Sequence, residues 1–221
     1  MSRSEEMQHV FVVDDDESVR SSLERLLTSE GLTVDTFASA QAFLDVLPRL
    51  DAPSCVVLDV GLPGLDGFEL HRRLRELGAP LAVVFLTGRG SIPMSVEAIK
   101  SGAVEFFTKP FLSDELVAGV RKAIAREHSA AQERRAMAEL RRRHLSLTAR
   151  EREVMAGVVE GLLNKQIAAR LGTSEVTVKE QRGHVMRKMS AESAADLVRM
   201  GMKLGILTLD NSSAPGKASQ S

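Results

Sequence analysis

Residues 10–16 read Val-Phe-Val-Val-Asp-Asp-Asp, four apolar residues followed by three consecutive aspartates. A short apolar run with an abrupt polar end predicts a buried strand. The chain holds two more runs of this kind, at 55–58 and 82–86, and two further short strands are predicted at 34–37 and 104–107.

Helical patterns separate these runs. Residues 17–30 place apolar side chains on one face and end at Gly31, and 93–100 has a proline in its first turn, where the missing N–H costs least. Alternating strands and helices predict a parallel five-stranded sheet covered on both faces, a flavodoxin-like (βα)5 domain. The other predicted helices are 40–47, 68–77 and one that opens at Ser113.

Polar residues end four of the predicted strands, at the sheet edge where such folds bind ligands. Three carboxylates there would repel one another unless a cation lies between them, and oxygen ligands suit Mg²⁺. A carboxylate can also attack a phosphoryl group and hold it as an acyl phosphate. The sequence therefore predicts phosphoryl-transfer chemistry in which Lys109 pairs with a phosphoryl oxygen. These strand-end residues are Asp14, Asp15, Asp59, Thr87 and Lys109.

Composition indicates an ordinary globular chain of 221 residues, long enough for two domains. Residues 1–125 carry 12 Lys/Arg against 19 Asp/Glu, whereas 126–221 carry 17 against 11, so an acidic half precedes a basic half. A single cysteine excludes an internal disulfide and a cysteine zinc cluster. The polar residues 1–9 and the lack of a membrane-length apolar run predict a cytoplasmic protein.

The basic half begins with a helical linker, since 126–145 is rich in Ala, Arg and Glu and lacks Pro and Gly. The stretch from Ser113 to Leu145 fits one long helix or two joined ones. Thr148 and Glu151 then form a capping box that opens a new helix. A short helix at 164–171 and a longer one at 175–189, joined through Gly172, predict a helix-turn-helix, and 191–204 adds a fourth helix.

The longer helix of this motif has a polar outer face. If Val178, Val185 and Met189 are buried, then Lys179 and Arg187 face outward, where they can neutralise phosphates or bind guanine. Glu180 could accept a hydrogen bond from cytosine. A plain helical bundle with a charged surface is the alternative. The other outward residues are Val176 and Gly183.

Residues 8–125 resemble the receiver domain of response regulators. The resemblance rests on the aspartates at 14–16, the stretch Leu-Asp-Val-Gly-Leu-Pro-Gly-Leu-Asp-Gly at 58–67, Leu-Thr-Gly at 86–88 and Phe-Phe-Thr-Lys-Pro-Phe at 106–111. It implies that Asp59 is the phosphoacceptor and that Lys109 precedes a cis proline. The implied Mg²⁺ ligands are Asp14, Asp15, Asp59 and the carbonyl of Gly61; the implied switch residues are Thr87 and Phe106.

The second half resembles the LuxR/NarL-type four-helix DNA-binding domain, and the whole chain to about residue 207 resembles the FixJ-type regulators. The resemblance implies that 175–189 is the recognition helix and that the last helix dimerises. Three residues depart from the family pattern: Leu163 replaces a capping Ser or Thr, Gln181 a common His, and Gly183 a larger residue. Glycine at 183 either lets the helix lie closer to DNA or gives up one contact. The candidate DNA contacts are Asn164, Lys165, Thr177, Lys179, Glu180, Arg182, Gly183, His184 and Arg187.

These features together predict a two-component response regulator that is not a metabolic enzyme. A histidine kinase would phosphorylate Asp59, and the phosphorylated chain would form a homodimer that binds promoter DNA. RNA polymerase is a further candidate partner. The predicted boundaries are a receiver at 1–125, a linker at 126–145, a DNA-binding domain at 146–207 and a disordered tail at 208–221.

Two other functions fit parts of the sequence. The receiver could act as a phosphoryl sink or relay while the basic half only binds a protein partner. Alternatively, the chain could bind DNA constitutively through an inactive receiver. The basic excess argues against the first, and the complete set of Asp, Thr and Lys residues argues against the second.

Overall fold

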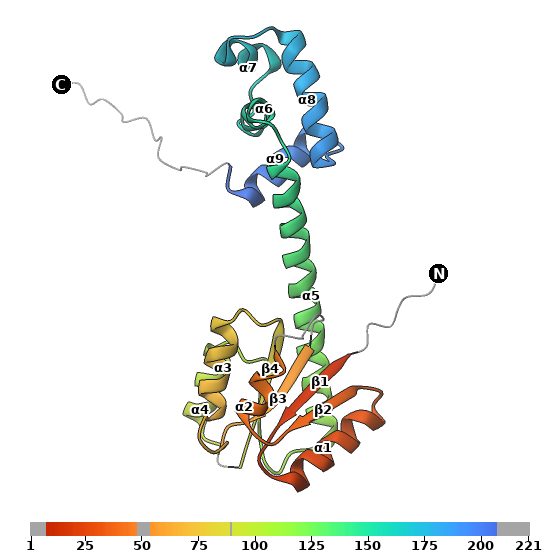
Figure 1. The fold of residues 1–221 in the computed structure, drawn as a ribbon, viewed down its shortest axis with the longest axis vertical. Helices are drawn as coiled ribbons and strands as arrows, with labels where there is room; N and C mark the ends of the chain where they lie inside the picture. The colour runs from red at the N-terminus through yellow and green to blue at the C-terminus, as the bar shows by residue number, and fades with distance from the viewer. Residues whose placement is uncertain (1–7, 48–53, 89, 207–221) are drawn as a thin grey trace, which may run out of the picture. The chain divides into compact units, whose positions relative to one another are not determined.

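The computed structural model describes residues 8–47, 54–88 and 90–206. Contacts divide the chain into two compact units, residues 1–132 and 133–221. The first unit is built on a sheet and the second is helical (Figure 1). No helix among the described residues is long and apolar enough to cross a membrane.

The first unit contains a five-stranded parallel sheet in the order β2-β1-β3-β4-β5. This order places β1 and β3 side by side at its centre, with Val13 opposite Leu58. Asp59 at the end of β3 is in turn opposite Leu86 in β4. The predicted (βα)5 sheet is therefore confirmed. The strands are β1 (His9–Val13), β2 (Thr33–Phe37), β3 (Ser54–Asp59), β4 (Leu81–Thr87) and β5 (Glu105–Thr108).

Short polar side chains start the helices of this unit, because they accept hydrogen bonds from the free N–H groups of the first turn. Asp16 caps α1, Ser39 caps α2, Asp66 caps α3 and Ser91 caps α4. The helices are α1 (Glu17–Ser29), α2 (Ala40–Leu44), α3 (Gly67–Glu76), α4 (Ile92–Lys100) and α5 (Ser113–Leu145).

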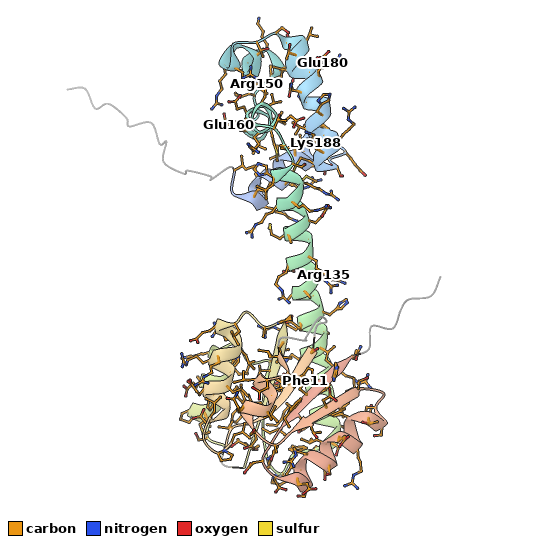
Figure 2. The ribbon with its side chains drawn as sticks, in the orientation of Figure 1. Phe11, Arg135, Arg150, Glu160, Glu180 and Lys188 are labelled. Carbon is orange, nitrogen blue, oxygen red and sulfur yellow. The ribbon has the colours of Figure 1, made fainter. Side chains whose placement is uncertain are left out.

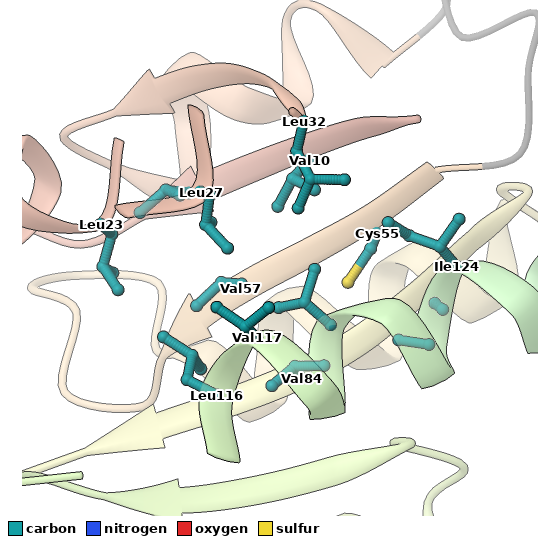
Figure 3. Close-up of a cluster of buried hydrophobic side chains, with 14 of the residues drawn as sticks. Val10, Leu23, Leu27, Leu32, Cys55, Val57, Val84, Leu116, Val117 and Ile124 are labelled. Carbon is teal, nitrogen blue, oxygen red and sulfur yellow. The ribbon is translucent and has the colours of Figure 1, made fainter. Parts of the chain in front are cut away.

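Two apolar clusters cover the two faces of the sheet, as alternation of side chains along each strand requires. Helices α1 and α5 cover one face, where Leu27 and Leu116 are fully buried. Figure 3 shows this cluster with Cys55 inside it. Burial raises the pKa of the Cys55 thiol well above its usual value. Phe43 and Leu70, from α2 and α3, are buried against the other face.

The stretch from Ser113 to Leu145 is one continuous helix. Its first half supplies Leu116 and Val120 to the core of the first unit, and Leu140 packs against the core of the second. Of the two arrangements that the sequence allowed, the structure therefore has the single helix.

The second unit packs α6, α7, α8 and α9 around Met155, Ile167 and Val178, which are almost fully buried. The last helix begins later than predicted, at residue 194 rather than 191, because Ser193 caps it by accepting from the N–H of Asp196. The proposed tail at 208–221 lies outside the described residues. These helices are α6 (Ala149–Val159), α7 (Asn164–Leu171), α8 (Glu175–Met189) and α9 (Ala194–Leu204).

Candidate functional site

The carboxyl ends of three strands bring the predicted polar residues to one edge of the sheet. Asp14 directly follows β1, Asp59 ends β3 and Thr87 ends β4. All three are buried, with 1%, 7% and 3% of their surfaces exposed. Burial of ionisable groups at this edge is costly unless they are paired, which points to a functional site.

Lys109 supplies the pairing charge. Its ammonium nitrogen lies 2.6 Å from Oδ2 of Asp14 and 2.9 Å from Oδ1 of Asp59. The second oxygen of Asp59 accepts a hydrogen bond of 2.6 Å from the backbone N–H of Gly61. Both oxygens of the predicted phosphoacceptor are thus held in place, one by a cation and one by the backbone.

Two buried carboxylates face one ammonium group, so negative charge remains in excess. Burial raises the pKa of Asp14, although its hydrogen bonds to Lys109 and to the N–H of Asp16 oppose the rise. For Lys109, burial opposes the charged form, yet the hydrogen bonds to both carboxylates outweigh it and raise the pKa. A site of this charge attracts a further cation.

Asp15 does not complete a three-carboxylate cluster. Its side chain is exposed, and in the described part of the chain no three acidic, histidine or cysteine side chains lie close enough to hold a metal. The predicted convergence is therefore limited to Asp14 and Asp59. These two still fit Mg²⁺, which takes one or two carboxylates and keeps several waters.

Glycines leave space around the Asp59 carboxylate and backbone. A Cβ atom at Gly61 would lie 3.1 Å from Oδ2 of Asp59, and one at Gly67 would lie 2.4 Å from the Asp59 carbonyl oxygen. Side chains at either position would crowd the end of β3. The Gly-rich loop after this strand is thus a requirement of the site as well as of the turn.

The predicted switch residues lie on two adjacent strands, Thr87 at the end of β4, which pairs with β3, and Phe106 on β5, the edge strand beyond β4. The backbone N–H of Lys109 donates to the carbonyl of Thr87 over 2.7 Å, which ties the end of β5 to that of β4. Phe106 is half-buried, and its ring centroid lies 6.4 Å from that of Phe85. The peptide bond between Lys109 and Pro110 is cis, as the resemblance implied.

A helix-turn-helix lies in the second unit. Gly172 ends α7 in the left-handed conformation, with φ of 61°, and Ser174 then caps α8. Leu163 at the start of α7 gives no side-chain cap, and only the reverse bond forms, from the Leu163 N–H to Gln166 over 2.8 Å. The weaker cap expected from the sequence is therefore present.

Helix α8 has the two faces that its sequence predicts. Val178, Val185 and Met189 are completely buried. Glu180 lies toward the start of this helix and Lys188 toward its end (Figure 2). The exposed residues of the outer face are Val176, Lys179, Glu180, Gly183 and Arg187.

Two candidate DNA contacts bind one another in the free chain. The guanidinium of Arg182 donates to the amide oxygen of Asn164 over 3.0 Å and so joins α8 to α7. Thr177 forms a hydrogen bond of 2.9 Å between its hydroxyl and that of Ser174, at the cap of α8. Lys165 is exposed.

Glu151, which the sequence predicts only as part of the capping box, also makes tertiary contacts. Its carboxylate accepts from the N–H of Thr148 over 2.7 Å and from the ammonium of Lys188 over 2.6 Å, while Nδ1 of His184 lies 3.7 Å away. A usable signal existed, because Glu151 precedes the buried Val154, Met155 and Val158 at helical spacing. This spacing puts a carboxylate on the buried face of α6.

Comparison with known proteins agrees with both halves of this description. Residues 10–121 match the response regulator receiver domain, and residues 145–201 match the bacterial regulatory proteins of the luxR family. The chain is similar to nodulation protein W of Bradyrhizobium diazoefficiens, with 48% identity over 89% of this chain and 86% of that protein.

Two further similarities span most of the chain. The transcriptional regulatory protein FixJ of Bradyrhizobium diazoefficiens is 45% identical over 90% of this chain and 97% of its own length. The structure of the response regulator StyR is 41% identical, with a TM-score of 0.80 over 89% of this chain and 99% of that one. The chain therefore belongs to the two-component response regulators that join a receiver to a LuxR-type DNA-binding domain, as FixJ does, and it is a transcription regulator rather than a metabolic enzyme.

Proposed function

We propose that Asp59 accepts a phosphoryl group from a sensor histidine kinase and that this event switches promoter binding by the second unit. The main support is the position of Lys109, whose ammonium bridges the buried carboxylates of Asp14 and Asp59 at one edge of the sheet. A cation in this position would pair with an oxygen of the incoming phosphoryl group.

The residues that this chain would contribute to the proposed reaction all lie at this edge of the sheet. An oxygen of Asp59 attacks phosphorus, the phosphorus–nitrogen bond of the kinase phosphohistidine breaks, and the histidine nitrogen keeps the bonding electrons and takes up a proton. Mg²⁺, when bound, would neutralise charge on the phosphoryl oxygens. It would be held by Asp14, Asp59 and the carbonyl of Gly61, and the side chain of Asp15, exposed in this structure, would have to turn toward the ion to join them.

In the proposed switch, β4 and β5 transmit the effect of phosphorylation at Asp59. The hydroxyl of Thr87 would bond to the phosphoryl group, and Phe106 would move inward with it. Helix α4, next to β5, exposes apolar side chains, since Ile92 is 81% exposed. We propose that this face, together with β5 and α5, forms the homodimer, and that two second units then bind two half-sites.

The outer face of α8 is the proposed reading surface for double-stranded promoter DNA. Lys179, Arg187 and Lys165 would contact phosphates or guanine, and Glu180 would accept from cytosine. A regulator of this kind would work in the cytoplasm with its kinase, and RNA polymerase is a proposed partner at the promoter.

One experiment tests both halves of the proposal. The full chain is treated with Mg²⁺ and a small-molecule phosphodonor, its mass is measured, and its affinity for duplex DNA selected from a random pool is determined. We expect one added phosphoryl group and tighter binding, both absent in Asp59→Asn. If Asp59→Asn is still phosphorylated, the acceptor is wrong; if affinity does not change on phosphorylation, the switch is wrong.

A further inference from the structure

Glycine inside a helix lowers stability relative to alanine, because it loses more conformational freedom on folding. It therefore calls for a physical reason wherever it occurs. Five glycines lie within the helices of the described residues: Gly67, Gly119, Gly157, Gly183 and Gly201.

Four of these glycines make room for another part of the chain. At each of them, an added Cβ atom would come within 3 Å of a neighbouring atom, a distance that real Cβ atoms essentially never show. The nearest atoms belong to the Asp59 backbone for Gly67 (2.4 Å), Phe107 for Gly119 (2.8 Å), Ile167 for Gly157 (2.8 Å) and Val159 for Gly201 (2.6 Å).

Gly183 is the exception among the described helical glycines. An added Cβ would meet no atom within 4 Å, and the residue is exposed near the middle of α8. Its φ is not in the left-handed region, so the backbone does not require glycine either. Nothing within the described part of this chain accounts for the missing side chain.

The surroundings of Gly183 indicate what fills the space. Lys179 and Arg187 are exposed one helical turn before and after it, and Glu180 and Val176 share the same face. An object that approaches the helix at Gly183 therefore lies between two cations. A second copy would bring the same cations together, whereas the phosphate-lined major groove has the complementary charge.

We infer that Gly183 is the point at which α8 comes closest to double-stranded DNA, and that the groove occupies the space of the missing side chain. The inference rests on the proposed DNA binding through α8. On this inference the glycine does more than give up a DNA contact. It lets α8 lie deeper in the groove, so that the neighbouring side chains reach the bases.

Opposite effects on stability and on binding test this role. In the full chain, Gly183→Ala should raise the melting temperature of the second unit by about 3–6 °C, because alanine is the better helix former. It should also weaken binding to the selected duplex at least about fivefold, and Gly183→Leu should weaken it further, as overpacking does in tight contacts.

The matched control adds bulk to another exposed helical position of the same unit. Ala138 in α5 is exposed, so Ala138→Leu should leave DNA affinity unchanged. Binding is measured by fluorescence anisotropy in Mg²⁺ and beryllium fluoride, beside a scrambled duplex. Light scattering reports self-association of the same variants.

The outcomes separate this inference from the proposed function. If the wild-type chain binds the duplex and Gly183→Ala binds equally well or better, the close approach is wrong although DNA binding stands. If the melting temperature of Gly183→Ala does not rise, glycine serves the fold at this position. That result would also overturn the inference. If Gly183→Leu changes only self-association, the occupant is a second copy. If the wild type binds no duplex, the proposed function itself fails.

Discussion

Lys188, near the end of the proposed recognition helix, donates a hydrogen bond of 2.6 Å to the carboxylate of Glu151 in the first turn of α6. Glu151 is 3% exposed, and the same oxygen accepts from the N–H of Thr148. One buried carboxylate therefore both caps α6 and fixes the C-terminal half of α8 against it.

Glu151→Ala should destabilise the second unit by about 2–3 kcal/mol, because it removes two hydrogen bonds to a buried carboxylate, the one from Lys188 and the one from the Thr148 N–H that completes the capping box. Urea unfolding followed by circular dichroism would measure the loss. The matched control is Glu153→Ala in the same helix, where an exposed pair with Arg150 is removed and the cost should stay below about 0.5 kcal/mol. Equal effects of the two substitutions would contradict a central role for Glu151.

The carboxylate of Glu151 should also make the stability of the second unit depend on pH. Burial alone would raise the pKa of Glu151, but the hydrogen bonds from Lys188 and Thr148 outweigh it and hold the pKa below the usual 4.5. The contribution is thus complete above about pH 4.5 and is lost as the pH falls through the lowered value in the folded chain. Unfolding curves of wild type and Glu151→Gln should converge as the pH falls below this range. A difference that stays constant with pH would rule out the linkage.

Lys109→Met should destabilise the first unit by about 2–3 kcal/mol at neutral pH, because it leaves Asp14 and Asp59 buried without their cation. Added Mg²⁺ should restore more stability to this variant than it adds to the wild type, since the excess negative charge is larger. Thermal melting with Mg²⁺ or with a chelator measures both effects. Lys100→Met, at an exposed position of α4, is the control and should respond as the wild type does. If Mg²⁺ raised the melting temperature of Lys109→Met no more than that of the wild type, the result would speak against a metal at this edge.

Leu163→Ser should stabilise the chain by about 0.5–1 kcal/mol, because serine can supply the side-chain cap that α7 lacks. Leu163 is 70% exposed, so its replacement sacrifices little packing. Leu163→Ala separates capping from the loss of an exposed apolar side chain and should have almost no effect. The melting temperatures of the two variants give the answer, and a serine variant no more stable than the alanine variant would show that the cap does not form.

The sheet and its functional edge could be predicted because the information is local. The three strands that carry these residues, β1, β3 and β4, contain continuous apolar runs. Because parallel strands place their carboxyl ends together, Asp14, Asp59 and Thr87 had to lie at one edge. The pairing of Lys109 with both carboxylates follows from the same topology. The exposed position of Asp15 does not, since it depends on the turn that leads from β1 into α1.

The contacts between helices of the second unit could not be predicted in the same way. Arg182 and Asn164 both fitted a DNA-binding face, yet they bind each other across α7 and α8. The partner of a long polar side chain depends on the crossing of two helices, and the apolar pattern of each helix alone does not specify that crossing. The same holds for Lys188 and Glu151.

The buried position of Cys55 also makes the chain well suited to labelling. It is the only cysteine of the sequence, it is completely buried, and burial keeps its thiol protonated, so it reacts poorly with thiol reagents. A cysteine introduced at an exposed position would therefore be the single site for a fluorophore or a spin label. Pairs of such sites, one in each unit, would allow distances between the units to be followed in solution without first removing a native thiol.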